Sequence, residues 1–243
     1  MSTVVPAVES PERFSSGMRC WLQVAATVAG ADIRSEARRP VALAGVVLFS
    51  VGALVVVHLA VAGAGSVEPR VAAGTIWVVL LLGALLATTR GVAAASDEHT
   101  WDALLLGTSD RSAIFIGKSC SAAALCGGVH LFTLAAFCAL FRSPPDAASM
   151  GLLLASVLIA DITFAAVGTL VGVVGLRARG RELLVATAFL PLSLPTLVVA
   201  VSVALTAFGV SEAPVGTSLA FLVGIAAVFV ATGVAAVPEI ATE

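Results

Sequence analysis

Charged residues are scarce in this sequence, and their scarcity excludes most soluble folds. Asp, Glu, Lys and Arg make up 12% of the 243 residues, whereas soluble domains carry about 25%. Hydrophobic residues make up 59%, and the mean hydropathy is +1.08. The net charge is only −2, and the sequence has no basic block that would attract a nucleic acid. The composition therefore predicts an integral membrane protein without nucleic-acid partners.

Several motifs of catalysis and metal binding are also missing. The four cysteines, Cys20, Cys120, Cys126 and Cys138, form no C-x-x-C or C-x-x-C-H pair, so we expect no metal or redox site. Residues 117–119 (GKS) end like a P-loop, but no glycine-rich loop precedes them. No spacing suggests a Ser/His/Asp or Cys/His nucleophile. We expect a protein that is not an enzyme and that uses ATP only through a partner subunit.

Long apolar runs dominate the chain instead. Each is near or above the roughly 20 residues that a helix needs to cross a bilayer, and none alternates as the strands of a barrel do. We therefore predict an all-α integral membrane protein with a six-helix transmembrane domain over residues 40–237. The predicted spans are 41–62, 71–89, 119–141, 150–176, 183–208 and 215–237.

A polar region precedes the spans. Residues 1–17 are rich in Pro and Ser, which predicts a disordered segment and no cleavable signal peptide. Between residues 18 and 39, polar residues such as Arg19 and Gln23 recur every four positions, opposite an apolar face with Trp21. This pattern predicts an amphipathic helix in the membrane interface, in contact with lipid. An ordinary soluble lead-in helix is the alternative.

Lys and Arg are distributed asymmetrically about the spans. With the N-terminus inside, eleven of the 13 basic residues lie in cytoplasmic segments, and only Arg70 and Arg142 lie outside. The positive-inside rule therefore predicts that both termini, including the short tail 238–243, are in the cytoplasm of a bacterial or archaeal cell. The loop after the fourth span could form a second cytoplasmic contact or bind anionic lipid, or its charges could only set the topology. Its basic residues are Arg177, Arg179 and Arg181.

The cytoplasmic stretch between the second and third spans contains a short helical pattern over residues 96–107. Ser96 is suited to cap a helix, acidic residues follow it, and Gly107 is placed to end it. A helix of this length cannot cross the bilayer, so we predict that it docks on an ATPase subunit as a coupling helix. The predicted contact residues are Asp97, Glu98, Trp101, Asp102, Leu104, Leu105 and Arg111.

Three polar residues inside the apolar runs are candidates for function, because ionisable groups are costly within a membrane. At about 1.5 Å per residue, His130 and Asp161 each lie roughly 16 Å into their spans, and those spans are antiparallel neighbours. We predict that the two share a buried hydrogen bond or proton, or that they serve only to hold the helices together. His58, near the outer end of the first span, is a weaker candidate as a haem ligand.

Two motifs carry a resemblance to a known family. LLLGTSDRSAIFIGK (residues 104–118), preceded by an acidic turn, resembles the corresponding segment of the CcmB family, and residues 164–195 resemble a second one. The similarity covers residues 30–208. The positions that match in the first motif are Leu104, Leu105, Leu106, Arg111, Ala113, Ile114, Gly117 and Lys118.

The resemblance implies a function that the residues alone do not. CcmB is the permease subunit of the haem-exporter ABC transporter of cytochrome c maturation, with a fold similar to ABC-2 or type V exporters. The resemblance implies a homodimer bound to two copies of the ATPase subunit CcmA, and further partners CcmC, CcmD and the haem chaperone CcmE. Haem would be a substrate and not a bound cofactor, and transport of haem and release of the loaded chaperone both remain open.

Two other functions are compatible with the same pattern. An ABC-2-type permease for a drug, lipid or polysaccharide would keep the fold and change the substrate. A membrane assembly factor that transports nothing would have no ATPase partner, and charge reversal at Glu98 would then have no effect.

Overall fold

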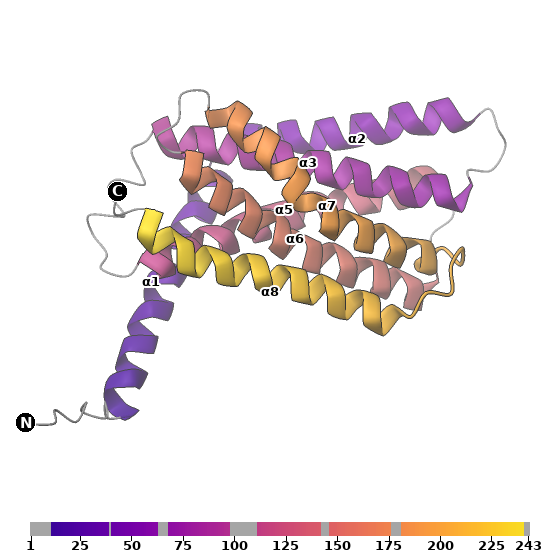
Figure 1. The fold of residues 1–243 in the computed structure, drawn as a ribbon. Helices are drawn as coiled ribbons and strands as arrows, with labels where there is room; N and C mark the ends of the chain where they lie inside the picture. Colours follow the sequence, from indigo (N-terminus) through magenta and orange to yellow (C-terminus); the bar gives the residue numbers. More distant parts are fainter. Residues whose placement is uncertain are drawn as a thin grey trace, which may run out of the picture.

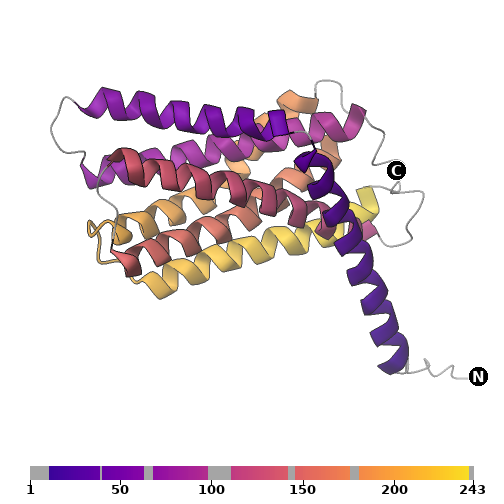
Figure 2. The same cartoon turned by 180° about the vertical axis from the view of Figure 1, so that it is seen from behind.

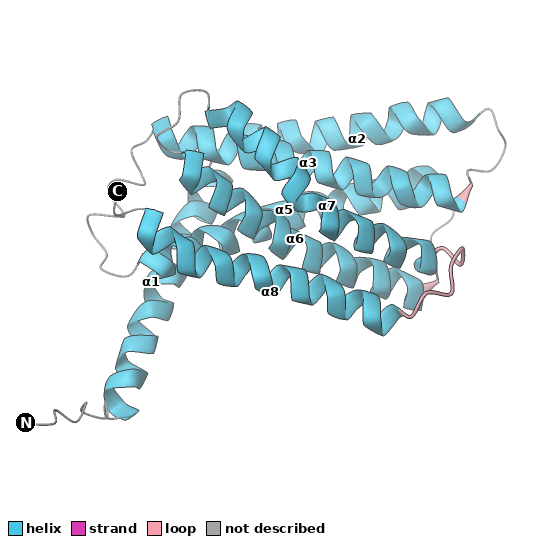
Figure 3. Cartoon of the chain, viewed as in Figure 1, coloured by secondary structure: helices cyan, strands magenta, loops and turns pink. Residues whose placement is uncertain are grey.

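The computed structural model describes residues 11–38, 40–62, 68–97, 111–141, 146–175 and 181–240. Within these ranges the chain forms helices joined by turns and contains no strand (Figure 3). The helices are α1 (Pro11–Ala37), α2 (Pro40–Ala62), α3 (Pro69–Asp97), α5 (Arg111–Phe141), α6 (Ala147–Gly175), α7 (Arg181–Ala207) and α8 (Val215–Ile240).

Six of these helices run side by side, and α1 lies across one end of them (Figures 1 and 2). Helices α2, α3, α5, α6, α7 and α8 are long and apolar enough to cross a membrane, which confirms the prediction of an all-α integral membrane protein with six spans. We call the end of the bundle where α1 lies the α1 end. It also holds the last turn of α8 and the first turn of α5 (Figure 1).

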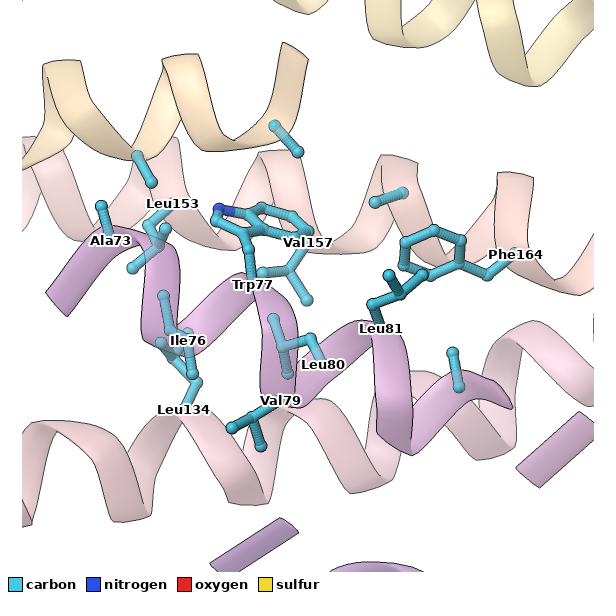
Figure 4. Packing of buried hydrophobic residues seen from close by; sticks show 14 of the residues in the cluster. Ala73, Ile76, Trp77, Val79, Leu80, Leu81, Leu134, Leu153, Val157 and Phe164 are labelled. Carbon is cyan, nitrogen blue, oxygen red and sulfur yellow. The ribbon is translucent and has the colours of Figure 1, made fainter. Parts of the chain in front are cut away.

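The core forms where α3, α5, α6 and α7 meet. Trp77 of α3 is only 1% exposed and lies beside Leu153 and Val157 of α6, while Ile76 faces Leu134 of α5 (Figure 4). Lipid tails are as apolar as these side chains, so helices in a bilayer associate through close packing instead of the hydrophobic effect. A tryptophan this well enclosed therefore fixes the spacing between α3 and α6.

Helix α5 begins well before its predicted span. It starts at Arg111, not at residue 119, and its 31 residues extend over about 46 Å. The hydrocarbon core of a bilayer is about 30 Å thick, so α5 is longer than an upright helix needs to cross it. Lys118 is compatible with this extension because it has an acidic partner on α1.

The helix ends correct two further expectations. Ser96 does not cap a new helix, because α3 continues through Ser96 to Asp97. The three alanines before Ser96 have high helix propensity and favour this continuation of the helix. Helix α1 begins at Pro11, inside the segment 1–17 for which no structure was expected. Proline suits the first turn of a helix, because a backbone N–H at that position would have no partner within the helix.

Two prolines lie inside α7 without ending it. Pro191 and Pro195 each remove a backbone donor, and α7 changes direction near its middle (Figure 1). At the end of the bundle opposite α1, Asp146 directly precedes α6, and its carbonyl oxygen accepts a hydrogen bond from Met150 N at 2.8 Å. The Ser149 hydroxyl bonds to the Asp146 carboxylate and lowers its pKa below the usual value. This interaction is typical of a helix N-cap.

Candidate functional site

The predicted coupling residues divide between described and undescribed parts of the chain. Asp97 is the last residue of α3, and Arg111 is the first residue of α5. Both ends lie at the α1 end of the bundle (Figure 1). The remaining residues of that prediction lie outside the described residues: Glu98, Trp101, Asp102, Leu104 and Leu105.

The start of α5 is held to the end of α8. The Arg111 guanidinium donates a hydrogen bond from Nη1 to the carbonyl oxygen of Pro238 at 3.3 Å. Carbonyls in the last turn of a helix have no partner within that helix, and a cation there also interacts favourably with the helix dipole. One turn further along α5, the Phe115 ring lies against Gly233 of α8 so closely that a Cβ at position 233 would have no room.

The other side of α5 is held to α1. Lys118 Nζ donates to Asp32 Oδ1 at 2.8 Å, and Trp21 Nε1 donates to Ser112 Oγ at 2.8 Å. The Ser121 hydroxyl lies 3.1 Å from Asp32 Oδ2 and 2.8 Å from the carbonyl oxygen of Lys118. Because that hydroxyl has a single proton, it donates to one of the two oxygens at a time.

A glycine determines how closely α1 approaches. A Cβ on Gly117 would lie 2.7 Å from the carbonyl oxygen of Ala25 and 2.8 Å from Cβ of Val28. Side chains do not tolerate such contacts, so a small residue at position 117 is needed for the observed approach. The glycine and lysine that ended like a P-loop in the sequence thus serve as the binding surface for α1.

The loop arginines are only partly placed. Arg177 and Arg179 lie outside the described residues, and Arg181 is the first residue of α7. The first turn of α7 lies at the α1 end (Figure 1). Whether these arginines contact a partner or lipid stays a prediction.

The intramembrane pair lies between α5 and α6. His130 Nδ1 and Asp161 Oδ1 are 2.5 Å apart, and the two side chains are 1% and 3% exposed. A hydrogen bond joins these two atoms, with the proton on either one, and the ring has Nε2 on its other side. Among the described residues, His130 Nε2 and Asp161 Oδ2 have no hydrogen-bond partner. The predicted contact is thus present, while its functional role stays a hypothesis.

Two further residues complete this site, and the sequence analysis did not identify them. At the position of a Cβ on Gly83 of α3, Ser50 Oγ of α2 would be 3.1 Å away and His130 Nε2 3.5 Å away. Ser50 is fully buried, and its hydroxyl also lacks a partner within the described residues. Because Gly83 has no side chain, Ser50 and His130 can approach the α3 backbone closely at this point. Four helices meet at this level through Ser50, Gly83, His130 and Asp161, which we call the mid-membrane cluster.

His58 lies apart from that cluster, near the C-terminal end of α2, which is the end far from α1. Its ring packs edge-on against Phe141, with centroids 5.3 Å apart and an interplanar angle of 73°. Phe141 in turn stacks on Phe137 at 4.6 Å. The Nδ1 atom of His58 is buried without a partner among the described residues. In the described part of the chain, no three His, Cys, Asp or Glu side chains form a metal site, and His58 stays a predicted haem ligand only.

A family model described as CcmB protein matches residues 23–241, which is nearly the whole chain. A search of curated proteins found no match.

Proposed function

The chain belongs to the CcmB family, and from this membership we propose that it is the permease subunit of an ABC transporter that acts in haem export or haem-chaperone release during cytochrome c maturation. The family match over residues 23–241 is the observation that carries the proposal. The six apolar helices agree with it. ATP hydrolysis belongs to a separate, CcmA-like subunit, and CcmC-, CcmD- and CcmE-like proteins complete the system.

The ATPase subunit binds at the α1 end in this proposal. Residues 98–110 connect α3 to α5, and both flanking helix ends lie there. Glu98, Trp101 and Asp102 form the docking contact, and Arg111 transmits its movement because it starts α5 and also bonds to the end of α8. The asymmetry of Lys and Arg supports a cytoplasmic location for this end and for both termini.

Two copies of the chain assemble in the proposed transporter, one for each ATPase subunit. Large apolar side chains such as Phe49, Phe132 and Phe221 are exposed on the single chain, and they contact lipid or the second copy. The mass of the complex purified in detergent or nanodiscs measures the number of copies. One copy per complex would contradict this part of the proposal.

The first experiment tests the pathway and the docking contact together. In a strain deleted for this gene, covalent haem staining measures mature c-type cytochromes. We expect their loss, with recovery on complementation by the wild type but not by a Glu98→Arg, Asp102→Arg variant. Glu68→Arg is the control, because Glu68 is an exposed acidic residue directly before α3, and α3 begins at the opposite end of the bundle (Figure 1). Normal cytochromes in the deletion strain would contradict the haem pathway and favour an ABC-2 permease for another substrate.

The mid-membrane pair has a place in this function if it does more than join α5 to α6. We propose that His130 and Asp161 share a proton and that the protonation of this pair changes during the transport cycle. Asp161→Asn keeps the size of the side chain and an oxygen acceptor for His130, but it removes the carboxylate charge. We expect assembly of this variant with the ATPase and a loss of holo-cytochromes. Unchanged cytochromes would leave the pair a purely structural contact.

A further inference from the structure

Helix α1 is attached to α5 by directional contacts over three turns. Trp21 bonds to Ser112, the backbone at Ala25 lies against Gly117, and Asp32 pairs with Lys118 (2.8 Å). These α5 residues all come within the first turns of the helix. Two helices joined only by apolar contacts can slide along each other, whereas polar contacts at both ends of a close approach fix their register.

The ion pair of this contact is partly shielded from water. The Lys118 and Asp32 side chains are 12% and 26% exposed. Charge-assisted hydrogen bonds are shorter and about twice as strong as neutral ones, and the partial burial limits screening by salt. Ser121 lies 3.1 Å from the second carboxylate oxygen, so its hydroxyl is a second donor for Asp32 whenever it is not bonded to the Lys118 carbonyl.

The position of this contact in the chain gives it a consequence for coupling. Ser112 is the second residue of α5, and residues 98–110 end just before it. Because α5 is one continuous helix, a displacement of its first turn is shared by everything bonded to that turn. Helix α1 therefore has to move with the start of α5, or its residues Trp21, Ala25 and Asp32 lose their contacts with α5.

We propose that α1 and the first turns of α5 form one rigid unit that positions residues 98–110 for the ATPase subunit, with Asp32 and Lys118 as positioning residues. The inference rests on the proposed function and adds a role for α1 and for the Gly117–Lys118 motif. When the unit is intact, a movement that reaches the start of α5 also moves α1. When it is broken, the ATPase still binds and hydrolyses ATP, but less of its motion reaches α5.

The test uses the full chain in complex with its ATPase subunit. Lys118→Glu brings two carboxylates together, and the double variant Asp32→Lys, Lys118→Asp restores a pair of opposite charge. Three quantities are measured: the amount of complex in the membrane, ATP hydrolysis per complex, and holo-cytochrome c. We expect Lys118→Glu to assemble and hydrolyse ATP while the yield of holo-cytochrome per ATP falls about tenfold, within the usual range of coupling between sites. The double variant should recover most of it.

A glycine pair provides a second, independent comparison. Gly117→Leu forces α1 away from α5, whereas Gly128→Leu on the same helix meets nothing within 4 Å of its Cβ. We expect Gly117→Leu to uncouple the complex as Lys118→Glu does and Gly128→Leu to behave as the wild type. A merely structural contact would lower the amount of complex but leave the yield per ATP unchanged in whatever complex remains.

The outcomes separate this inference from the proposed function. If the deletion strain makes normal cytochromes, the proposed function fails. If the wild type restores cytochromes and Lys118→Glu does so equally, only the positioning role fails. If Lys118→Glu does not accumulate, Asp32→Asn replaces it, because the amide keeps an acceptor for Lys118. Loss of that protein as well would make the contact a folding requirement and overturn the proposal.

Discussion

The mid-membrane cluster and the α1–α5 contact each contain a close pair of an acid and a base, but the two pairs differ in their access to water. His130 and Asp161 join consecutive helices and are 1% and 3% exposed, whereas Lys118 and Asp32 lie 86 residues apart and are 12% and 26% exposed. A third pair, Glu68 and Arg70, is 3.8 Å apart and about two-thirds exposed. The same kind of interaction thus occurs at three levels of burial.

The difference shows what each pair can contribute. An ionised group that loses its partner deep in the bundle has no water to replace it, so the loss is costly. A group at the α1 end can turn to solvent, so breaking its pair costs less and can occur during a functional cycle. Fully exposed pairs contribute little. The expected effects of substitution therefore follow burial, and the four predictions below test that order.

Removal of one member of the mid-membrane pair should have the largest effect. His130→Leu leaves the Asp161 carboxyl buried without its partner, and we expect the free energy of unfolding to fall by about 3–5 kcal/mol. Unfolding in SDS, followed by circular dichroism on protein in mixed micelles, measures it. The double variant His130→Leu, Asp161→Leu removes both polar groups and should recover most of the loss. An equal loss in the single and the double variant would contradict this account.

Substitution of Gly83, which packs closely against Ser50 and His130, should have the next largest effect on stability. Gly83→Ala places a Cβ 3.1 Å from Ser50 Oγ, which is tighter than ordinary packing, and overpacking of this kind costs about 1–3 kcal/mol. Gly74→Ala on the same helix meets nothing within 4 Å and serves as the control. We expect the control to match or slightly exceed the wild type in SDS unfolding, because alanine has the higher helix propensity. Equal stability of both variants would show that the cluster can relax around a methyl group.

The α1–α5 pair should contribute less to stability than to coupling. Lys118→Met keeps the length of the side chain and lets Asp32 turn to water, so we expect a loss of about 1 kcal/mol. The same unfolding measurement applies, and limited proteolysis reports whether α1 becomes accessible. A loss as large as that of His130→Leu would place this contact with the buried interactions and remove the contrast between the two regions.

Removal of the exposed Glu68–Arg70 pair should have almost no effect on stability. Glu68→Gln is expected to change stability by less than about 0.5 kcal/mol, because surface substitutions away from special features rarely do more. Repetition at high and low salt checks the cause, since an exposed ion pair is screened by salt. A larger, salt-sensitive effect would mean that Glu68 interacts with more than Arg70.

The pairing of His130 with Asp161 could be predicted because it depends on local information. The two residues lie at similar depth in consecutive spans, and a short loop forces those spans to be antiparallel neighbours. Ser50 and Gly83 could not be found in this way. Ser50 comes from α2, which is not a sequence neighbour of α5 or α6. Gly83 has no side chain to mark it, and apolar faces that contact lipid look the same as faces that contact another helix.

The number of spans and the amphipathic pattern of α1 follow from composition and periodicity, because the bilayer sets the length of an apolar helix and the interface selects a two-sided one. The prediction that a helix starts at Ser96 was wrong, because α3 continues through that residue although serine is a suitable cap. The attachment of α1 to α5 depends on tertiary structure alone. Asp32, Gly117 and Lys118 gain their meaning only when segments 86 residues apart in the chain meet at one place, and no local pattern encodes such a meeting.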